Sequence, residues 1–246
     1  MNNDYFKVIR GGLNSTFQDE GRKGLYHIGL PFSGVMDKRN YLIANKLNNN
    51  NKNDAVLEFA YQGPLLKYFG RKRNIVITGN VNFKILKTGK SYDNGECYRT
   101  IEINDGDTID IISTNKSVYG YLSINGGFNL EKVWDSFSTT IRAKVGPNNG
   151  QKLIDGQEIK LNEENSSQQR KLDYINSKIE FIRVIKGTNF NYFSEQSIKE
   201  FFSKEFEVTK LTDRMGMRLE GTKLINKKNT NIKSEGLIKG TIQVPA

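Results

Sequence analysis

Short apolar runs, each followed closely by glycine, asparagine or aspartate, constrain this chain more than any other feature of its sequence. Most of these runs are too short for a typical helix, and the turn-forming residues after them favour strands. Many short strands with close turns are typical of barrels and sandwiches, so the sequence predicts a mainly β fold. The predicted strands cover residues 6–10, 56–61, 74–78, 82–86, 108–112, 118–124, 179–185, 207–211 and 237–244.

Two segments depart from the strand pattern and predict helices. Asp37 is placed to cap the start of a helix whose apolar residues recur at helical spacing as far as Leu47. An asparagine-rich run over residues 48–53 interrupts that spacing and predicts the end of the helix. The second predicted helix covers residues 195–202.

The length of 246 residues allows one large domain or two small ones. Residues 162–171 contain no apolar side chain that would anchor them to a core, which favours a boundary there. We therefore expect a first β domain over residues 1–161, a linker over 162–178 and a partial second β domain over 179–246. The second segment is short for an independent core, because small β domains rarely bury enough apolar area without disulfides or a bound metal ion.

The balance of 37 basic and 27 acidic residues gives a net charge of +10, which raises nucleic acid as a partner. The basic residues are mostly lysines scattered along the chain, and the densest clusters are only residues 71–73 and 227–228. Nucleic-acid sites need clustered charge with stacking aromatics, so we expect solvated loops and no nucleic-acid partner. No run approaches a membrane span and no signal peptide is recognisable, so we expect a cytoplasmic protein with no membrane partner.

The chain's inventory of reactive residues limits its chemistry. His27 is the only histidine, which excludes His-rich metal sites and relays of two imidazoles, and we predict no metal site. A dyad of His27 with Cys97, the single cysteine, lacks any orienting motif, so a buried inert thiol is the favoured interpretation. Acid–base chemistry must then rest on carboxylates, tyrosine or lysine.

Three segments combine glycine with unusual polar residues in an otherwise lysine-rich chain. The choice of arginine at Arg22, Arg214 and Arg218 indicates a need for a planar, bidentate donor suited to carboxylate or phosphate. The alternative is an arginine–aspartate pair that braces a turn, and for Asp19 with Arg22 both interpretations stay open. For Arg214 and Arg218 we favour anion binding. The segments are residues 16–22, 29–37 and 213–219.

These motifs, in this order, resemble the biotin-dependent carboxyltransferase family, also called allophanate hydrolase subunit 2. The resemblance begins with the QDxGR pattern of residues 18–22 and the GLPxSGxMD pattern of residues 29–37, and it covers essentially the whole chain. It implies a pair of cyclophilin-like β-barrel domains. Family members continue beyond the equivalent of residue 245, so it also implies a second barrel that lacks several strands here. Further matching positions are residues 44–47, Glu58, 63–64, Gly79, 121–127, 135–139, 213–221, 234–236 and 240–245.

The chain is most similar to the family's free-standing bacterial form, the C-type subunit of 5-oxoprolinase. The resemblance implies a subunit that opens 5-oxo-L-proline, a lactam, to L-glutamate with A-type and B-type partner subunits and is inactive without them. ATP and Mg²⁺ would enter through the complex. One alternative is the carboxyltransferase half of a urea- or allophanate-type system, in which biotin would arrive on another polypeptide because this chain has no Met-Lys-Met attachment sequence. The other is a non-catalytic regulator of a kinase inhibitor.

Lactam activation needs cations around a developing oxyanion or phosphate and a carboxylate that steers water. The resemblance therefore implies two groups of site residues. The catalytic candidates are Asp19, Arg22, Asp37 and Glu58, with the three carboxylates assigned to proton handling or Mg²⁺ coordination. The candidates for substrate or phosphate binding are Gln18, Ser33, Asn45, Arg214, Arg218 and Gln243.

Overall fold

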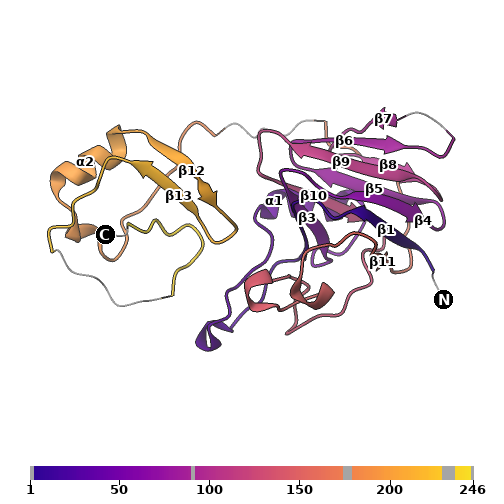
Figure 1. Cartoon of the computed structure of the whole chain (residues 1–246), viewed down its shortest axis with the longest axis horizontal. Coiled ribbons are helices and arrows are strands. Elements are labelled where there is room, and N and C mark those ends of the chain that lie inside the picture. The colour runs from indigo at the N-terminus through magenta and orange to yellow at the C-terminus, as the bar shows by residue number, and fades with distance from the viewer. Residues whose placement is uncertain (1–2, 90–91, 174–178, 229–235, 245–246) are drawn as a thin grey trace. The chain divides into compact units, whose positions relative to one another are not determined.

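The computed structural model describes residues 3–89, 92–173, 179–228 and 236–244 (Figure 1). The fold is mainly β with antiparallel sheets, as the sequence predicts. The chain divides into two compact units, residues 1–175 and 176–246. Within the described residues, no helix is both long and apolar enough to cross a membrane.

Unit 1 consists of two antiparallel sheets. The larger has the strand order β11-β1-β4-β9-β6-β7 and the smaller has the order β2-β3-β10-β5-β8. The strands are β1 (Tyr5–Arg10), β2 (Asn14–Gln18), β3 (Val56–Ala60), β4 (Leu65–Phe69), β5 (Arg73–Thr78), β6 (Val81–Leu86), β7 (Tyr92–Asn94), β8 (Thr100–Ile103), β9 (Thr108–Thr114), β10 (Tyr119–Ile124) and β11 (Glu158–Lys160). One α-helix, α1 (Lys38–Leu47), and three short 3-10 turns, η1 (Tyr26–Ile28), η2 (Ile141–Ala143) and η3 (Asn148–Gly150), complete the regular structure.

The core of unit 1 is built from alternate residues of both sheets. Phe6 and Leu66 from the larger sheet and Phe17, Leu57 and Leu122 from the smaller belong to one buried apolar cluster. Side chains of this size contribute about 1.5–3 kcal/mol each when they leave water. This burial explains why the short apolar runs form strands, since every second side chain reaches the core.

The other face of the five-stranded sheet is also buried, and it combines polar side chains with a small apolar cluster that includes Val56 and Tyr41. Thr16 lies opposite Glu58, Glu58 lies opposite Tyr121, and Tyr121 lies opposite Thr78 in the strand register. All four are at most 2% exposed. Helix α1 covers part of this face, and the Thr78 hydroxyl donates to the Asn40 carbonyl at 2.9 Å. The sheet thus separates an apolar core from a buried polar layer.

Helix α1 forms where the sequence predicts it. The Asp37 carboxylate caps its N-terminus by accepting from the Asn40 backbone N–H at 3.0 Å and from the Asn40 side-chain amide at 2.7 Å. The Ser123 hydroxyl of β10 donates to the Ala44 carbonyl at 2.9 Å, which ties the middle of the helix to the sheet. Capping and this tie orient the helix over the polar layer.

Residues 162–171, which the composition assigns to a linker, belong to unit 1. The Thr100 backbone N–H donates to the Arg170 carbonyl at 2.9 Å, and the Asn165 N–H donates to the Asn125 side-chain oxygen at 3.0 Å. Polar hydrogen bonds therefore attach a segment that has no apolar anchor. The rest of the expected linker, residues 174–178, lies outside the described residues.

Unit 2 contains the 3-10 turn η4 (Phe190–Tyr192), helix α2 (Glu195–Ser203) and a hairpin of β12 (Phe206–Thr212) with β13 (Met217–Gly221). Ser194 caps α2 by accepting from the Ser197 N–H at 3.0 Å. The predicted helix over 195–202 and the predicted strand over 207–211 are confirmed.

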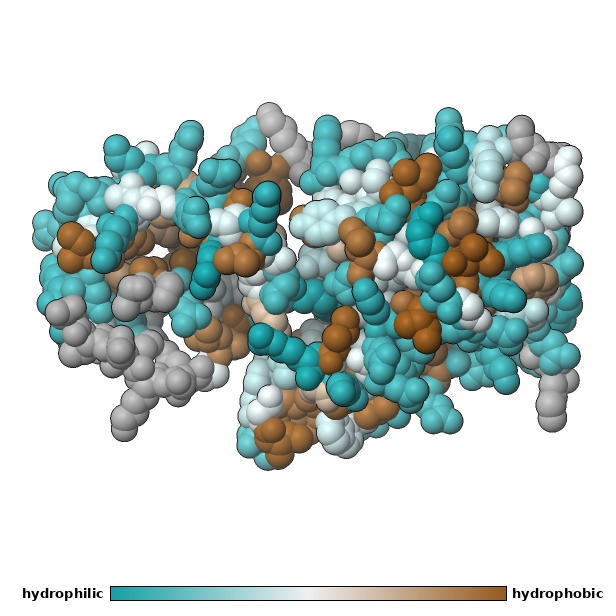
Figure 2. Space-filling view, viewed as in Figure 1, coloured by the Kyte–Doolittle hydropathy of each residue, from teal (hydrophilic) through white to brown (hydrophobic). Residues whose placement is uncertain are grey.

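Two predicted strands of unit 2, residues 179–185 and 237–244, are wrong, because neither is a strand in the described structure. Their apolar side chains are exposed, with Ile185 96% exposed. Figure 2 shows such brown apolar side chains at the molecular surface among hydrophilic ones. An apolar run becomes a strand only when a neighbouring strand pairs with its backbone.

Candidate functional site

The polar layer of unit 1 ends at β2, where residues 136–140 run along the edge of that strand. The Thr139 N–H donates to the Phe17 carbonyl at 2.9 Å, which fixes this segment beside β2. Four site residues predicted from the sequence lie here together with two threonines that were not predicted. We call Gln18, Asp19, Arg22, Ser33, Thr139 and Thr140 the β2-end cluster.

Asp19 is the structural centre of the β2-end cluster, and its carboxylate is buried. Its Oδ1 atom accepts from the hydroxyls of Ser136 (2.7 Å) and Ser138 (2.6 Å) and from the Gly21 N–H (2.9 Å). Its Oδ2 atom accepts from the Phe137 N–H at 2.7 Å. This carboxylate holds a turn in place, and four protein donors occupy its oxygens.

Arg22 is a buried cation, only 2% exposed. Its Nε donates to the Val133 carbonyl at 3.1 Å and its Nη1 to the Thr140 hydroxyl at 3.3 Å. Its Nη2 has no hydrogen-bond partner among the described residues, and none of their carboxylates lies within ion-pair distance of the guanidinium. Burial lowers the pKa of Arg22, while the charge of Asp19 opposes that shift.

Two further groups of the cluster have unused hydrogen-bonding capacity. The Gln18 side-chain N–H₂ donates to the Thr139 carbonyl at 3.0 Å, but its Oε1 atom has no partner among the described residues. The Thr139 hydroxyl is likewise buried without a described partner. Arg22 offers a donor, Gln18 an acceptor and Thr139 both. Such a set complements an amide, which combines an acceptor oxygen with N–H donors.

Glu58 and Tyr121 form a second buried pair on the polar layer. The Tyr121 hydroxyl donates to Glu58 Oε2 at 2.9 Å, and the Met36 N–H donates to the same oxygen at 2.8 Å. Burial and the charge of Glu58 raise the pKa of Tyr121, so the phenol stays protonated as a donor. Asp37 joins the pair through its backbone N–H, which donates to the Tyr121 oxygen at 2.7 Å. The side chain of Asp37 is engaged in capping α1.

The contacts of Asn45 stabilise the fold. Its buried amide donates to the Asp54 carbonyl at 2.8 Å and so braces the loop between α1 and β3.

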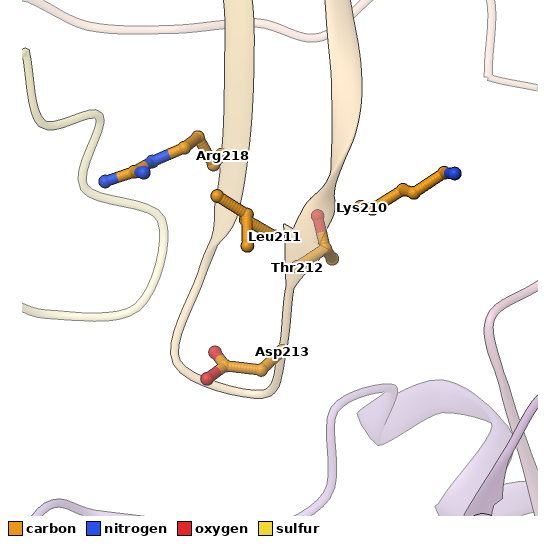
Figure 3. Close-up of a pocket in the computed structure, with 5 residues that line it drawn as sticks. All are labelled: Lys210, Leu211, Thr212, Asp213 and Arg218. Atoms are coloured by element: carbon orange, nitrogen blue, oxygen red, sulfur yellow. The ribbon is translucent and has the colours of Figure 1, made fainter.

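The predicted residues of unit 2 lie on or after its hairpin. Asp213 Oδ1 accepts from the N–H groups of Met215 (2.7 Å) and Gly216 (3.2 Å), so the DRMG motif containing Arg214 forms the hairpin turn. A cavity of about 420 Å³ is lined by residues 210–213 and Arg218. Figure 3 shows Arg218 and Lys210 pointing away from opposite sides of the hairpin. Gln243 is exposed in an irregular segment.

The expected Mg²⁺ role of Asp19, Asp37 and Glu58 stays a prediction. No group of three or more His, Cys, Asp or Glu residues among them is arranged to hold a metal ion. The carboxylates of Asp19 and Asp37 accept hydrogen bonds from protein donors. Cys97 is also unsuited to ligation, because burial raises the pKa of its thiol.

Sequence reasoning singled out Asp19, Arg22 and Glu58 but assigned no role to Tyr121 or to the hydroxyls of residues 136–140. A usable signal exists in the strands. Polar residues at alternate positions of otherwise apolar strands, such as Glu58 in VLEFA, indicate a buried polar face.

The chain belongs to the family of the carboxyltransferase domain, subdomain A and B, whose model matches residues 28–246. Urea amidolyase of Saccharomyces cerevisiae is 31% identical over 231 residues, which cover 88% of this chain and 12% of that protein. The C-type subunit of 5-oxoprolinase from Haemophilus influenzae is 27% identical over 239 residues, which cover 94% of this chain and 73% of that protein. Among solved structures, the urea carboxylase of Kluyveromyces lactis matches with a TM-score of 0.76 at 26% identity, over 91% of this chain and 21% of that chain.

Proposed function

We propose that this chain is the C-type subunit of an ATP-dependent 5-oxoprolinase, which opens 5-oxo-L-proline to L-glutamate together with A-type and B-type subunits. The observation that carries the proposal is a buried polar layer that contains the carboxylate of Glu58 and ends at the β2-end cluster, where Arg22 has no ion-pair partner among the described residues. The match over 94% of this chain to a C-type subunit of 5-oxoprolinase supports it. A cytoplasmic location is consistent with a reaction that consumes ATP.

The chemistry of the lactam explains why these groups are needed. An unactivated amide carbon is a poor electrophile, and ATP supplies activation by phosphorylating the amide oxygen. The Arg22 guanidinium is a buried cation that can hold an anionic group of the substrate in a dry site, where charge interactions are strong. Glu58, with the Tyr121 proton beside it, is the group that accepts or returns a proton. Because the carboxylates of Asp19 and Asp37 are held by donors, we assign ATP and Mg²⁺ to the partner subunits.

Reconstitution tests this proposal. The chain is mixed with purified A-type and B-type subunits, and glutamate release from 5-oxo-L-proline is measured with and without ATP. We expect ATP-dependent release that disappears when this chain is omitted. No turnover with all three subunits folded and associated would contradict the proposal.

The 31% identity to urea amidolyase favours a second candidate, the carboxyltransferase half of a urea- or allophanate-type system. The same preparation is supplied with a carboxybiotinyl carrier protein and urea. Transfer of the carboxyl group to urea, without glutamate release from 5-oxo-L-proline, would support this candidate over the first.

A further inference from the structure

The unpartnered Nη2 of Arg22 is the most unusual buried group in the described structure. Buried cations in proteins are paired or fully hydrogen-bonded, because water no longer compensates their charge. Arg22 donates through Nε and Nη1 only to neutral oxygens, those of Val133 and Thr140. The charge of the guanidinium and its free donor therefore both call for an anionic oxygen that the described residues do not provide.

Residues 23–33 follow this arginine in the chain and return to its backbone. The Phe32 carbonyl accepts from the Arg22 backbone N–H at 2.7 Å, so the end of the segment lies directly against the residue. Gly21 and Gly34 flank the segment, both with positive φ angles (95° and 83°). A Cβ atom on Gly21 would lie 2.6 Å from the Phe32 carbonyl oxygen, so only glycine allows this close approach.

The segment is weakly attached to the rest of unit 1. Residues 26–29 are exposed, and the hydrogen bonds of Ile28, Gly29 and Leu30 stay inside the segment. Apart from the bond to Arg22, the segment makes one hydrogen bond to described residues outside it. In that bond, Ser33 Oγ lies 2.5 Å from Thr140 Oγ1. Few buried contacts and exposed backbone are typical of segments that open locally.

Thr140 links the segment to the cation. Its hydroxyl oxygen accepts from Arg22 Nη1 and is shared with Ser33, so one atom fixes both the guanidinium and the segment. Ser33 also has a φ angle of 59°, a left-handed conformation that is costly for a residue with a side chain. The bond between Ser33 and Thr140 thus holds the segment closed against a local strain.

We propose that Arg22 Nη2 is the receptor for the carboxylate of a small ligand, and that residues 23–33 are a flap held closed by the Ser33–Thr140 hydrogen bond. Nη1 is already engaged by Thr140, so Nη2 is the donor left for one carboxylate oxygen, and the Ser33 hydroxyl becomes a second donor once its bond to Thr140 breaks. The identity of the ligand rests on the proposed function, in which 5-oxo-L-proline carries the carboxylate.

Trp134, the only tryptophan, provides the readout. It is 54% exposed and follows Val133, whose carbonyl accepts from Arg22 Nε. Stopped-flow tryptophan fluorescence of the full chain is recorded against 5-oxo-L-proline and against its uncharged amide, 5-oxoprolinamide. We expect a saturable change with the acid and a response at least about tenfold weaker with the amide, because a hydrogen bond between charged groups is lost.

Three variants separate the parts of this proposal. Arg22→Gln is expected to weaken binding about tenfold or more, whereas Arg142→Gln, which removes an exposed arginine nearby, leaves it unchanged. Ser33→Ala is expected to raise the association rate about fivefold, because the closed flap loses one hydrogen bond. Melting curves confirm that each variant is folded.

The outcomes are distinct from those of the reconstitution. Binding that is equal for acid and amide, or unaltered in folded Arg22→Gln, overturns the carboxylate site even if the complex releases glutamate. An association rate unchanged in Ser33→Ala overturns the flap. Binding through Arg22 with no glutamate release by the complete complex leaves this inference standing and overturns the proposed function.

Discussion

At the residue scale, Asp19 determines the shape of the β2-end cluster because its carboxylate accepts four hydrogen bonds in a buried position. The donors come from the turn at Gly21 and from residues 136–138, more than a hundred positions along the chain. The same carboxylate opposes the effect of burial on the Arg22 pKa. One residue therefore both joins two distant segments and favours the charged form of the arginine.

Replacement of Asp19 by alanine tests this role. Asp19→Ala leaves buried hydroxyl and N–H donors without acceptors, so we expect the free energy of unfolding to fall by about 2–4 kcal/mol in urea denaturation. Asp173→Ala is the control, because Asp173 pairs with Lys171 at an exposed site and its loss should change stability by less than about 0.5 kcal/mol. Equal effects of the two substitutions would show that Asp19 has no special structural role.

Stability should also depend on pH through Asp107, a buried carboxylate. Burial alone would raise its pKa, but hydrogen bonds from Lys87 and from the N–H groups of Asn104 and Thr88 outweigh burial and lower the pKa. The stabilisation is then present above the unfolded-state pKa of about 4 and is lost as the pH falls through the lower folded-state pKa. Urea denaturation between neutral and acidic pH should show a shallower acid loss in Asp107→Asn, and an identical pH profile would contradict this assignment.

Individual site residues were predictable where their type was unusual for their surroundings. Arg22 in a lysine-rich chain is such a case, whereas Glu58 was identified through the resemblance to the family, and both are buried. The hydroxyl partner of Arg22 was not predictable, because Thr140 lies 118 positions away and only the fold brings it close. Local sequence carries no information on such a contact.

At the element scale, apolar runs located six strands of unit 1 to within about two residues. Strand β2 (Asn14–Gln18) was missed because its sequence, NSTFQ, is polar, yet four of its five residues are buried. It faces the polar layer, where buried side chains hydrogen-bond with one another. Hydropathy patterns fail at a sheet whose second face is both buried and polar.

The cap of helix α1 gives a test at the same scale. Asp37→Ala removes the acceptor for the Asn40 N–H and is expected to lower the free energy of unfolding by about 1 kcal/mol. Asp37→Asn retains a good capping oxygen and should cost only a small part of this. Urea denaturation compares the two, and a cost for Asp37→Asn that equals the cost for Asp37→Ala would show that capping is not the main role of this side chain.

At the scale of the whole molecule, the two units differ in how far they bury their apolar side chains. Unit 1 encloses a core between two sheets, whereas residues 179–185 of unit 2 carry exposed isoleucine and phenylalanine side chains. The net charge of +10 is distributed over the chain and gives no basic stripe in the sequence. Function in this account therefore rests on the buried polar layer of unit 1 and on partner subunits.

The central claim is that this polar layer is part of the reacting site, and Glu58→Gln in the reconstituted three-subunit complex tests it most directly. Glu131→Gln, an exposed position, is the matched control. We expect ATP-dependent glutamate release to fall by about 10²–10⁴-fold in Glu58→Gln, with complex assembly and melting temperature retained, and to be unchanged in the control. A release rate within about twofold of the native rate in an assembled Glu58→Gln complex would contradict the claim.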